Sequence, residues 1–169
     1  MVSKGIIIDI IIIIVAVLVI WIGLQVAFGT QNPFYVISSI SMTPELQVYD
    51  IIVTKGNIPF EDIIVGDIIV FKRPSDHERV IVHRVVLVLD HQETLVTKGD
   101  ANPASVEGTD FPITEDEYIG KVVYTLPQVG YISQLLKPPT NYVLVAIIIG
   151  IIAIKYVLNK NENDRFNTT

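Results

Sequence analysis

The strongest constraint on this chain is a long apolar run near its N-terminus, Ile6 to Phe28, in which only Asp9 and Gln25 are polar. A helix of this length crosses a hydrocarbon core of roughly 30 Å. Isoleucine favours strands in water, but a segment in lipid must satisfy its own backbone hydrogen bonds, so we expect a helix. The run exceeds the apolar region of a cleaved leader, and no clear small-residue cleavage site follows it. The sequence therefore predicts a retained transmembrane anchor at 6–28.

A second apolar segment, 142–158, is shorter and carries Lys155 near its end. A lysine in that place can extend its amine to the membrane interface, so the segment is a candidate for a second span. A buried or surface-lying helix is the alternative. Basic residues before the first span and after the second favour a cytoplasmic location for both ends. We therefore expect a multi-pass protein of the cell membrane, with residues 30–140 on the extracytoplasmic face and a cytoplasmic tail at 159–169.

The region between the two apolar segments is typical of a β domain. Short stretches rich in Ile, Val, Tyr and Phe alternate with turn signals such as Gly56-Asn57 and Gly66-Asp67. This spacing is typical of antiparallel sheets. We expect a mainly β fold, compact and β-rich, flanked by the two membrane helices. The predicted strands are Tyr35–Ser39, Asp50–Lys55, Asp67–Lys72, Val80–Leu89, Thr94–Lys98 and Tyr118–Tyr124.

The amino-acid composition argues against several kinds of site and of binding partner. The 169-residue chain has no cysteine, which excludes disulfides and thiolate metal sites. Its formal charge of −6 argues against binding to a phosphate backbone, and so against nucleic acid as a partner. His77, His83 and His91 lack the short helical spacing of a zinc site. We therefore expect neither a metal nor an organic cofactor.

One histidine occupies a position from which it can act as a base. In an extended segment at Val80–Leu89, alternate side chains share a face. His83 then points among apolar side chains, and Arg84 points to the opposite face. A neutral imidazole in such surroundings accepts a proton from a nearby hydroxyl. The residues predicted to share the face of His83 are Ile81, Val85, Leu87 and Leu89.

Serine, histidine and aspartate occur in an order that suits nucleophilic catalysis. A serine hydroxyl becomes nucleophilic when a positioned base removes its proton, histidine suits that role near neutral pH, and an aspartate orients the histidine. The candidates are Ser41, His83, and either Asp100 or Asp110. Each also has an ordinary structural explanation: Ser41 as a cap ahead of Pro44, His83 as a core residue, and each aspartate as a turn residue. Spacing alone does not choose between these explanations.

Four short motifs follow the apolar run in order: Ser39-Ile40-Ser41-Met42-Thr43-Pro44, Gly66-Asp67-Ile68-Ile69-Val70-Phe71, Ile81-Val82-His83-Arg84-Val85-Val86 and Lys98-Gly99-Asp100-Ala101-Asn102. Together they resemble the boxes of the type I signal peptidases, specifically the archaeal and endoplasmic-reticulum branch. The corresponding family patterns are Ser-x-Ser-Met-x-Pro, Gly-Asp-Ile-Val, a histidine box and Lys-Gly-Asp-x-Asn. The resemblance covers roughly 6–131. Ile40 departs from the family, in which a small or polar residue is usual there.

The resemblance implies a role for each candidate residue. Ser41 is similar in position to the family's nucleophile, and His83 stands where the bacterial branch has a lysine base. Asp100 resembles one of the two family aspartates. The second usually follows a few residues later, where this chain has Val106, so Asp110 is the better match for it. Which of the two carboxylates faces His83 stays open.

The resemblance also suggests how the developing oxyanion is held. Ser39 matches a position whose side chain, in bacterial relatives, helps to bind that oxygen, and the backbone N–H of Ser41 is the second donor. Ser38, directly beside Ser39, is the alternative.

The function implied by the resemblance is that of a membrane-bound serine endopeptidase that removes N-terminal signal peptides from secreted precursor proteins. The expected partners are such precursors, membrane lipid and a protein translocation channel. Two alternatives stay open. One is a non-catalytic, membrane-tethered peptide-binding domain that scaffolds a secretion complex, and the other is a related serine peptidase with a specialised substrate.

Overall fold

The computed structural model describes residues 4–89 and 94–132, together with residues 142, 146, 147, 149 and 150. The chain divides after Val129 into two units, and the fold described below belongs to the first. The predicted second span, 142–158, lies for the most part outside the described residues, and the tail at 159–169 lies wholly outside them.

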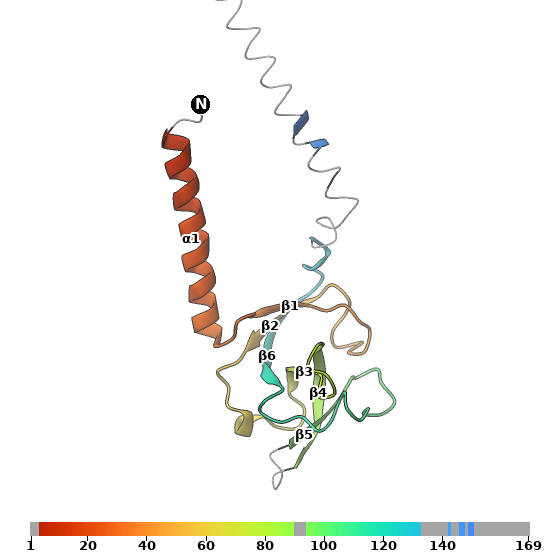
Figure 1. Cartoon of the computed structure of the whole chain (residues 1–169). Coiled ribbons are helices and arrows are strands. Elements are labelled where there is room, and N and C mark those ends of the chain that lie inside the picture. Colours follow the sequence, from red (N-terminus) through yellow and green to blue (C-terminus); the bar gives the residue numbers. More distant parts are fainter. Residues whose placement is uncertain (1–3, 90–93, 133–141, 143–145, 148, 151–169) are drawn as a thin grey trace, which may run out of the picture. The chain divides into compact units, whose positions relative to one another are not determined.

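The N-terminal apolar run forms one long helix, α1, from Lys4 to Phe28, which confirms the predicted helix (Figure 1). Its segment Ile11–Phe28 has a mean hydropathy of 2.9, and none of that segment is buried. Among the described residues it is the one helix long and apolar enough to cross a membrane. A helix that is apolar on every side and has no protein around it needs an apolar solvent, which a bilayer provides.

The rest of the first unit is built on one six-stranded sheet, which confirms the expected β-rich, antiparallel architecture (Figure 1). The strands lie in the order β1-β2-β6-β3-β4-β5, and every neighbouring pair is antiparallel. A short 3-10 turn, η1, spans Phe60–Asp62. The strands are β1 Phe34–Val36, β2 Ile51–Lys55, β3 Ile68–Lys72, β4 Val80–Leu89, β5 Thr94–Lys98 and β6 Tyr118–Leu126.

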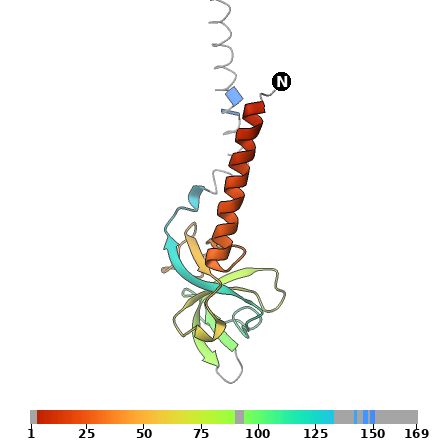
Figure 2. The same cartoon turned by 90° about the vertical axis from the view of Figure 1, so that its left-hand side faces the viewer.

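The inner strand β6 links the two halves of the sheet, because it pairs with β2 on one side and with β3 on the other. Both pairings change register, the first between Val53 and Thr54 and the second between Val70 and Phe71. Such irregularities bend a strand and increase its twist. The bend is visible in Figure 2, where β6, drawn in teal, curves along its length. The curvature lets a single sheet enclose apolar side chains on both of its faces.

Two apolar clusters, one on each face of β3, form the core. Successive side chains of a strand point to opposite faces, so Ile69 and Phe71 enter the first cluster and Val70 enters the second. All three are fully buried. The first cluster contains Phe60, Ile63, Ile69, Phe71, Val85, Leu95 and Ile113. The second contains Ile37, Met42, Leu46, Ile52 and Val70, and its first three members belong to the loop that carries Ser41.

The predicted alternation along β4 holds only as far as Val85. His83 and Val85 are both buried, as expected, but Leu87 is 47% exposed and Leu89 is 38% exposed. The pairing of β4 with β5 shifts register between Val85 and Leu87, and Val88 packs against the first cluster instead. The prediction that Leu87 and Leu89 share the face of His83 was therefore wrong, because an irregularity in the strand exchanges its two faces beyond Val85.

Gly120 offers a test of how the curved sheet is held together. A Cβ at this position would lie 2.6 Å from the carbonyl oxygen of Lys55 and 2.9 Å from the Cα of Gly56. Both are backbone atoms, which cannot rotate away, so Gly120→Ala must push β6 and β2 apart. We expect a loss of about 1–3 kcal/mol in the free energy of unfolding, measured by chemical denaturation of the whole chain in detergent.

The matched control for Gly120→Ala is Val123→Ala, which changes a 44% exposed side chain on the same strand. We expect this substitution to alter the unfolding free energy by no more than about 0.5 kcal/mol. Equal stability of the wild type and Gly120→Ala would show that the close approach of the two strands is not required.

Candidate active site

Ser41 lies in the loop that connects β1 to β2. The loop closes at its base, since the Ile37 N–H donates to the carbonyl oxygen of Asp50 at 2.8 Å. Just after Ser41, the side chains of Met42 and Leu46 are each 1% exposed and anchor the loop in the second apolar cluster. The Leu46 N–H also donates to the Met42 carbonyl at 2.9 Å. Ser41 itself is half-buried, so its hydroxyl sits on a fixed loop at the edge of the core.

His83 lies on β4, opposite Ile69 of β3, and is 6% exposed. The ring of Phe71 packs edge-on against it, with 6.5 Å between the ring centroids. The Nε2 atom of His83 is 3.1 Å from the Ser41 Oγ, and its Nδ1 atom is 2.5 Å from the Oδ1 of Asp110. A carboxylate only accepts hydrogen bonds, so Nδ1–H donates to Asp110 and leaves Nε2 free to accept from the Ser41 hydroxyl.

Asp110 is completely buried, and both of its carboxylate oxygens have partners. Oδ1 lies 3.2 Å from the Thr97 hydroxyl as well as against His83, and Oδ2 accepts the Val106 N–H at 2.8 Å. The loop that presents the carboxylate is closed by two backbone bonds, Asp110 N–H to Val106 O at 2.7 Å and Thr97 N–H to Asp110 O at 2.9 Å. A buried carboxylate is costly unless it is hydrogen-bonded, and this set of donors meets that requirement.

Asp100, the other candidate carboxylate, does not contact His83. It forms a two-pronged ion pair with Arg84, Nε to Oδ1 at 2.9 Å and Nη2 to Oδ2 at 2.6 Å. This hydrogen bonding raises the pKa of Arg84 above its ordinary value, with the negative charges of Asp100 and Glu45 adding to the effect. Because His83 and Arg84 are neighbours on one strand, they point to opposite faces, and each meets its own aspartate.

The segment after Asp100 packs directly on the backbone of Ser41. The Ala101 N–H donates to the Ser41 carbonyl at 2.8 Å. At Gly99, a Cβ would lie 2.7 Å from the Ser41 carbonyl oxygen and 2.9 Å from His83 Nε2. Glycine is therefore needed at this position for the segment to approach both residues. The Arg84–Asp100 ion pair fixes the same segment from its outer side.

Ser39 lies beside the nucleophile candidate, with 3.1 Å between its Oγ and the Oγ of Ser41. Within the described part of the chain, Ser38 makes no hydrogen bond to Ser41.

Thr97 and the Val106 N–H were not singled out in the sequence, although both hold Asp110. A signal for Thr97 was available, because it precedes the Lys98-Gly99-Asp100 motif on a predicted strand. The Val106 contact depends on a loop conformation that spacing does not reveal.

Ser41 and His83 open into a cleft of about 360 Å³. One wall is the segment from Tyr35 to Met42, and the other is the start of β4 with the turn before it.

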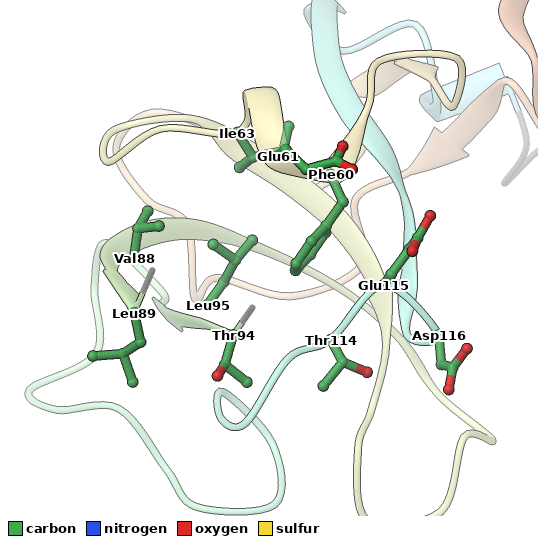
Figure 3. A pocket seen from close by; sticks show the side chains of 10 residues that line it. All are labelled: Phe60, Glu61, Ile63, Val88, Leu89, Thr94, Leu95, Thr114, Glu115 and Asp116. Carbon is green, nitrogen blue, oxygen red and sulfur yellow. The ribbon is translucent and has the colours of Figure 1, made fainter. Parts of the chain in front are cut away.

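A larger cavity of about 490 Å³ lies elsewhere and contains neither Ser41 nor His83 (Figure 3). In Figure 3 its floor is apolar, with Phe60 and Leu95 at the centre, and carboxylates such as Glu115 stand at its rim. No group of side chains suited to a metal ion occurs among the residues that the structure describes.

Comparison with known proteins identifies the family. The family model for signal peptidase, peptidase S26, matches residues 6–88. The chain is 31% identical over 147 residues to the signal peptidase complex catalytic subunit SEC11 of Fusarium vanettenii, covering 83% of each chain. It is 35% identical over 124 residues to the protein of the same name from Sclerotinia sclerotiorum, covering 69% of this chain and 71% of the relative. The chain therefore belongs to the signal peptidase family, peptidase S26, in the branch of the SEC11 subunits, and is a serine peptidase of that family.

Proposed function

We propose that this chain removes N-terminal signal peptides from secreted precursor proteins, with Ser41 as the nucleophile, His83 as the general base and Asp110 as the group that orients His83. The observation that carries the proposal is the unbroken line of contacts from the Ser41 hydroxyl through both nitrogens of His83 to a buried carboxylate, 3.1 Å and 2.5 Å in turn. Its occurrence in a chain that resembles SEC11 subunits over most of its length favours a peptidase over a scaffold without catalytic activity.

The reaction is acyl transfer in two stages. As the Ser41 oxygen attacks the carbonyl carbon of the scissile peptide, its proton passes to His83 Nε2, and Asp110 stabilises the imidazolium that forms. When the tetrahedral intermediate collapses, the C–N bond breaks, the same proton moves to the leaving amine, and an ester to Ser41 remains. Water then attacks the ester, His83 accepts the water's proton, and that proton returns to Ser41 as the signal peptide leaves with a free carboxylate.

The developing oxyanion needs hydrogen-bond donors that are already in place. Within the described residues, the Ser41 backbone N–H makes no hydrogen bond and is available for this role. The Ser39 hydroxyl, 3.1 Å from the Ser41 Oγ, is near enough to be the second donor. We assign Ser39 this role in preference to Ser38. Asp100 acts differently: it is a positioning residue that holds the 98–102 segment against the Ser41 backbone through Arg84.

The membrane anchor accounts for how substrate reaches the cleft. A signal peptide carries its own apolar helix, so the precursor and α1 share one bilayer, which raises their local concentration and limits their relative orientation. The proposed organisation is an anchor at 6–28, a peptidase domain at 30–140 on the extracytoplasmic face of the cell membrane, a second span at 142–158 and a cytoplasmic tail. Membrane lipid and a protein translocation channel are the further partners that this arrangement brings close.

The proposal is tested first by Ser41→Ala. Removing the hydroxyl should lower the rate of precursor cleavage in detergent by on the order of 10⁴-fold or more, because nothing else can form the acyl-enzyme. Ser75→Ala, an exposed serine outside the cleft, is the matched control and should keep its activity. Cleavage at the wild-type rate by Ser41→Ala would refute the mechanism. Assaying a panel of precursors would distinguish a general signal peptidase from one with a specialised substrate.

Substitutions of Asp110 and Glu107, two acidic residues of one loop, test whether Asp110 orients His83 or only contributes negative charge. Asp110→Asn keeps the side-chain shape but cannot stabilise the imidazolium, so we expect kcat to fall by about 10²–10⁴-fold with little change in KM. Glu107→Gln alters an exposed carboxylate in the same loop and should change kcat little. The measurement is steady-state cleavage of one precursor by both variants, and a greater loss in Glu107→Gln would contradict the assignment of Asp110.

A double-mutant cycle tests the positioning role of the Arg84–Asp100 pair. Arg84→Gln and Asp100→Asn should each lower both kcat and the free energy of unfolding, and the double variant should lose less than the sum. Because the two side chains are 30% and 20% exposed, we expect a coupling of about 0.5–1.5 kcal/mol in stability. The Arg73–Asp76 pair, whose side chains are 23% and 29% exposed, is the matched comparison and should show a coupling of similar size in stability. Additive effects at Arg84 and Asp100 would remove the positioning role.

A further inference from the structure

The cleft beside Ser41 and His83 carries charge of only one sign. Arg73 and Arg79 line it, and no carboxylate does. The chain as a whole has a formal charge of −6, so the positively charged lining of the cleft contrasts with the net charge of the protein. Neither arginine has a part in the mechanism above, and the four sequence motifs do not include them. Their position in the cleft therefore needs another explanation.

The two arginines differ in whether their guanidinium group is already paired with a carboxylate. Arg73 is clamped by Asp76, with its Nε 3.0 Å from Asp76 Oδ1 and its Nη2 on the other oxygen. This hydrogen bonding, aided by the more distant charge of Arg79, lowers the pKa of Asp76 to about 2. The Arg79 side chain itself makes no hydrogen bond or ion pair with any described residue. Arg79 is exposed and is therefore the free cation of the cleft among the described residues.

The position of Arg79 along the strand fixes where it would meet a bound peptide. It directly precedes Val80, the first residue of β4, and His83 lies further along the same strand. At about 3.3 Å per residue, the Cα atoms of Arg79 and His83 are at most about 13 Å apart, since Arg79 lies at a bend just before the strand. A peptide bound in an extended conformation has the same rise, so Arg79 stands opposite the residue about four positions from the scissile bond. Because Arg79 precedes His83 along the chain, a peptide that runs alongside this strand meets Arg79 on one side of the scissile bond only.

We propose that Arg79 determines specificity by favouring precursors that carry an aspartate or glutamate about four residues from the cleaved bond, on one side of it. This inference rests on the proposed function, because it takes the occupant of the cleft to be an extended precursor. A guanidinium forms short, charge-assisted hydrogen bonds to a carboxylate. Because Arg79 is exposed, the gain is modest, about two- to fivefold in kcat/KM.

The test uses the whole chain in detergent and a series of synthetic precursors that share one signal peptide. A single Asp, Asn or Lys is placed in turn at each position through about six residues on either side of the cut. In the wild type we expect the ratio of kcat/KM for Asp over Asn to rise to about two to five at one or two adjacent positions, on one side only. Arg79→Gln should bring that ratio to about one, and Arg79→Glu should make Lys the preferred residue there.

Lys72→Gln is the matched control. Lys72 is an exposed cation at the end of β3, in register with Val80, and it does not line the cleft. The substitution removes the same charge as Arg79→Gln from the same hairpin, so a preference that arises by contact with Arg79 should survive it. The wild-type preference should also shrink between about 0.05 M and about 0.5 M salt, since an exposed ion pair is screened.

The outcomes separate this inference from the function beneath it. Equal ratios at every position in the wild type, a preference that persists in Arg79→Glu, or one that is lost equally in Lys72→Gln would each overturn the role of Arg79 while precursors are still cleaved. Failure of the wild type to cleave any precursor, or wild-type cleavage by Ser41→Ala, would overturn the proposed function itself. Each ratio is measured within one variant, so a change in its overall activity does not affect the comparison.

Discussion

The buried carboxylate of Asp110 is the constraint on which the site depends. An ionised group with no solvent exposure is stable only if the fold supplies donors for both oxygens, and here the donors come from three separate places: a strand histidine, a strand threonine and a loop N–H. Satisfying one carboxylate therefore fixes β4, β5 and the loop that follows β5 relative to one another. The same contact sets the tautomer of His83, so a requirement of folding and a requirement of the proposed mechanism are met by a single interaction.

The second constraint is the alternation of side chains along β4. His83 and Arg84 are adjacent, and the side chains of neighbouring strand residues point to opposite faces. The two aspartates that follow β5 therefore pair with different residues of β4. Asp110 meets the histidine in the core, while Asp100 meets the arginine near the surface. Their roles differ accordingly. Asp110 bonds to His83, the proposed base, and Asp100 holds the segment whose Ala101 N–H and Gly99 pack against Ser41.

Much of the fold could be predicted because it depends on local preferences. Runs of β-branched residues between turn signals predicted six strands, and the observed bounds coincide with the expected ones at seven of the twelve strand ends and differ by one to three residues at the others. The irregularities were not predictable. The register shift beyond Val85, which turns Leu87 outward, follows from the fit of one strand against its neighbour and the core, and no property of residues 80–89 alone specifies it.

The same distinction applies to the site. The parity of His83 on its strand predicted that it would be buried. The motifs contained Ser41 and Asp100, and Asp110 was the match proposed for the second family aspartate. The choice between Asp100 and Asp110 could not be made from the sequence, because it depends on how the loop after β5 closes. That loop turns back through Gly108, which has a φ of 72°, and through the bond from the Asp110 N–H to the Val106 carbonyl. A conformation of this kind is settled by tertiary contacts, above all by the buried partners of the carboxylate itself.

The way Ser41 is supported explains how its hydroxyl can face an open cleft. Ile40 is 70% exposed and Met42 is 1% exposed, so the chain passes from solvent to core across Ser41, the proposed nucleophile. Rigidity is supplied from behind, by Met42 in the apolar cluster and by the Ala101 N–H on the Ser41 carbonyl, which leaves the front free for an extended peptide. An extended peptide loses conformational freedom when it binds, and this cost lowers its affinity for an open cleft. If enzyme and substrate are both held in the bilayer, tight binding is unnecessary, because confinement already provides the local concentration that a soluble peptidase must obtain from contacts.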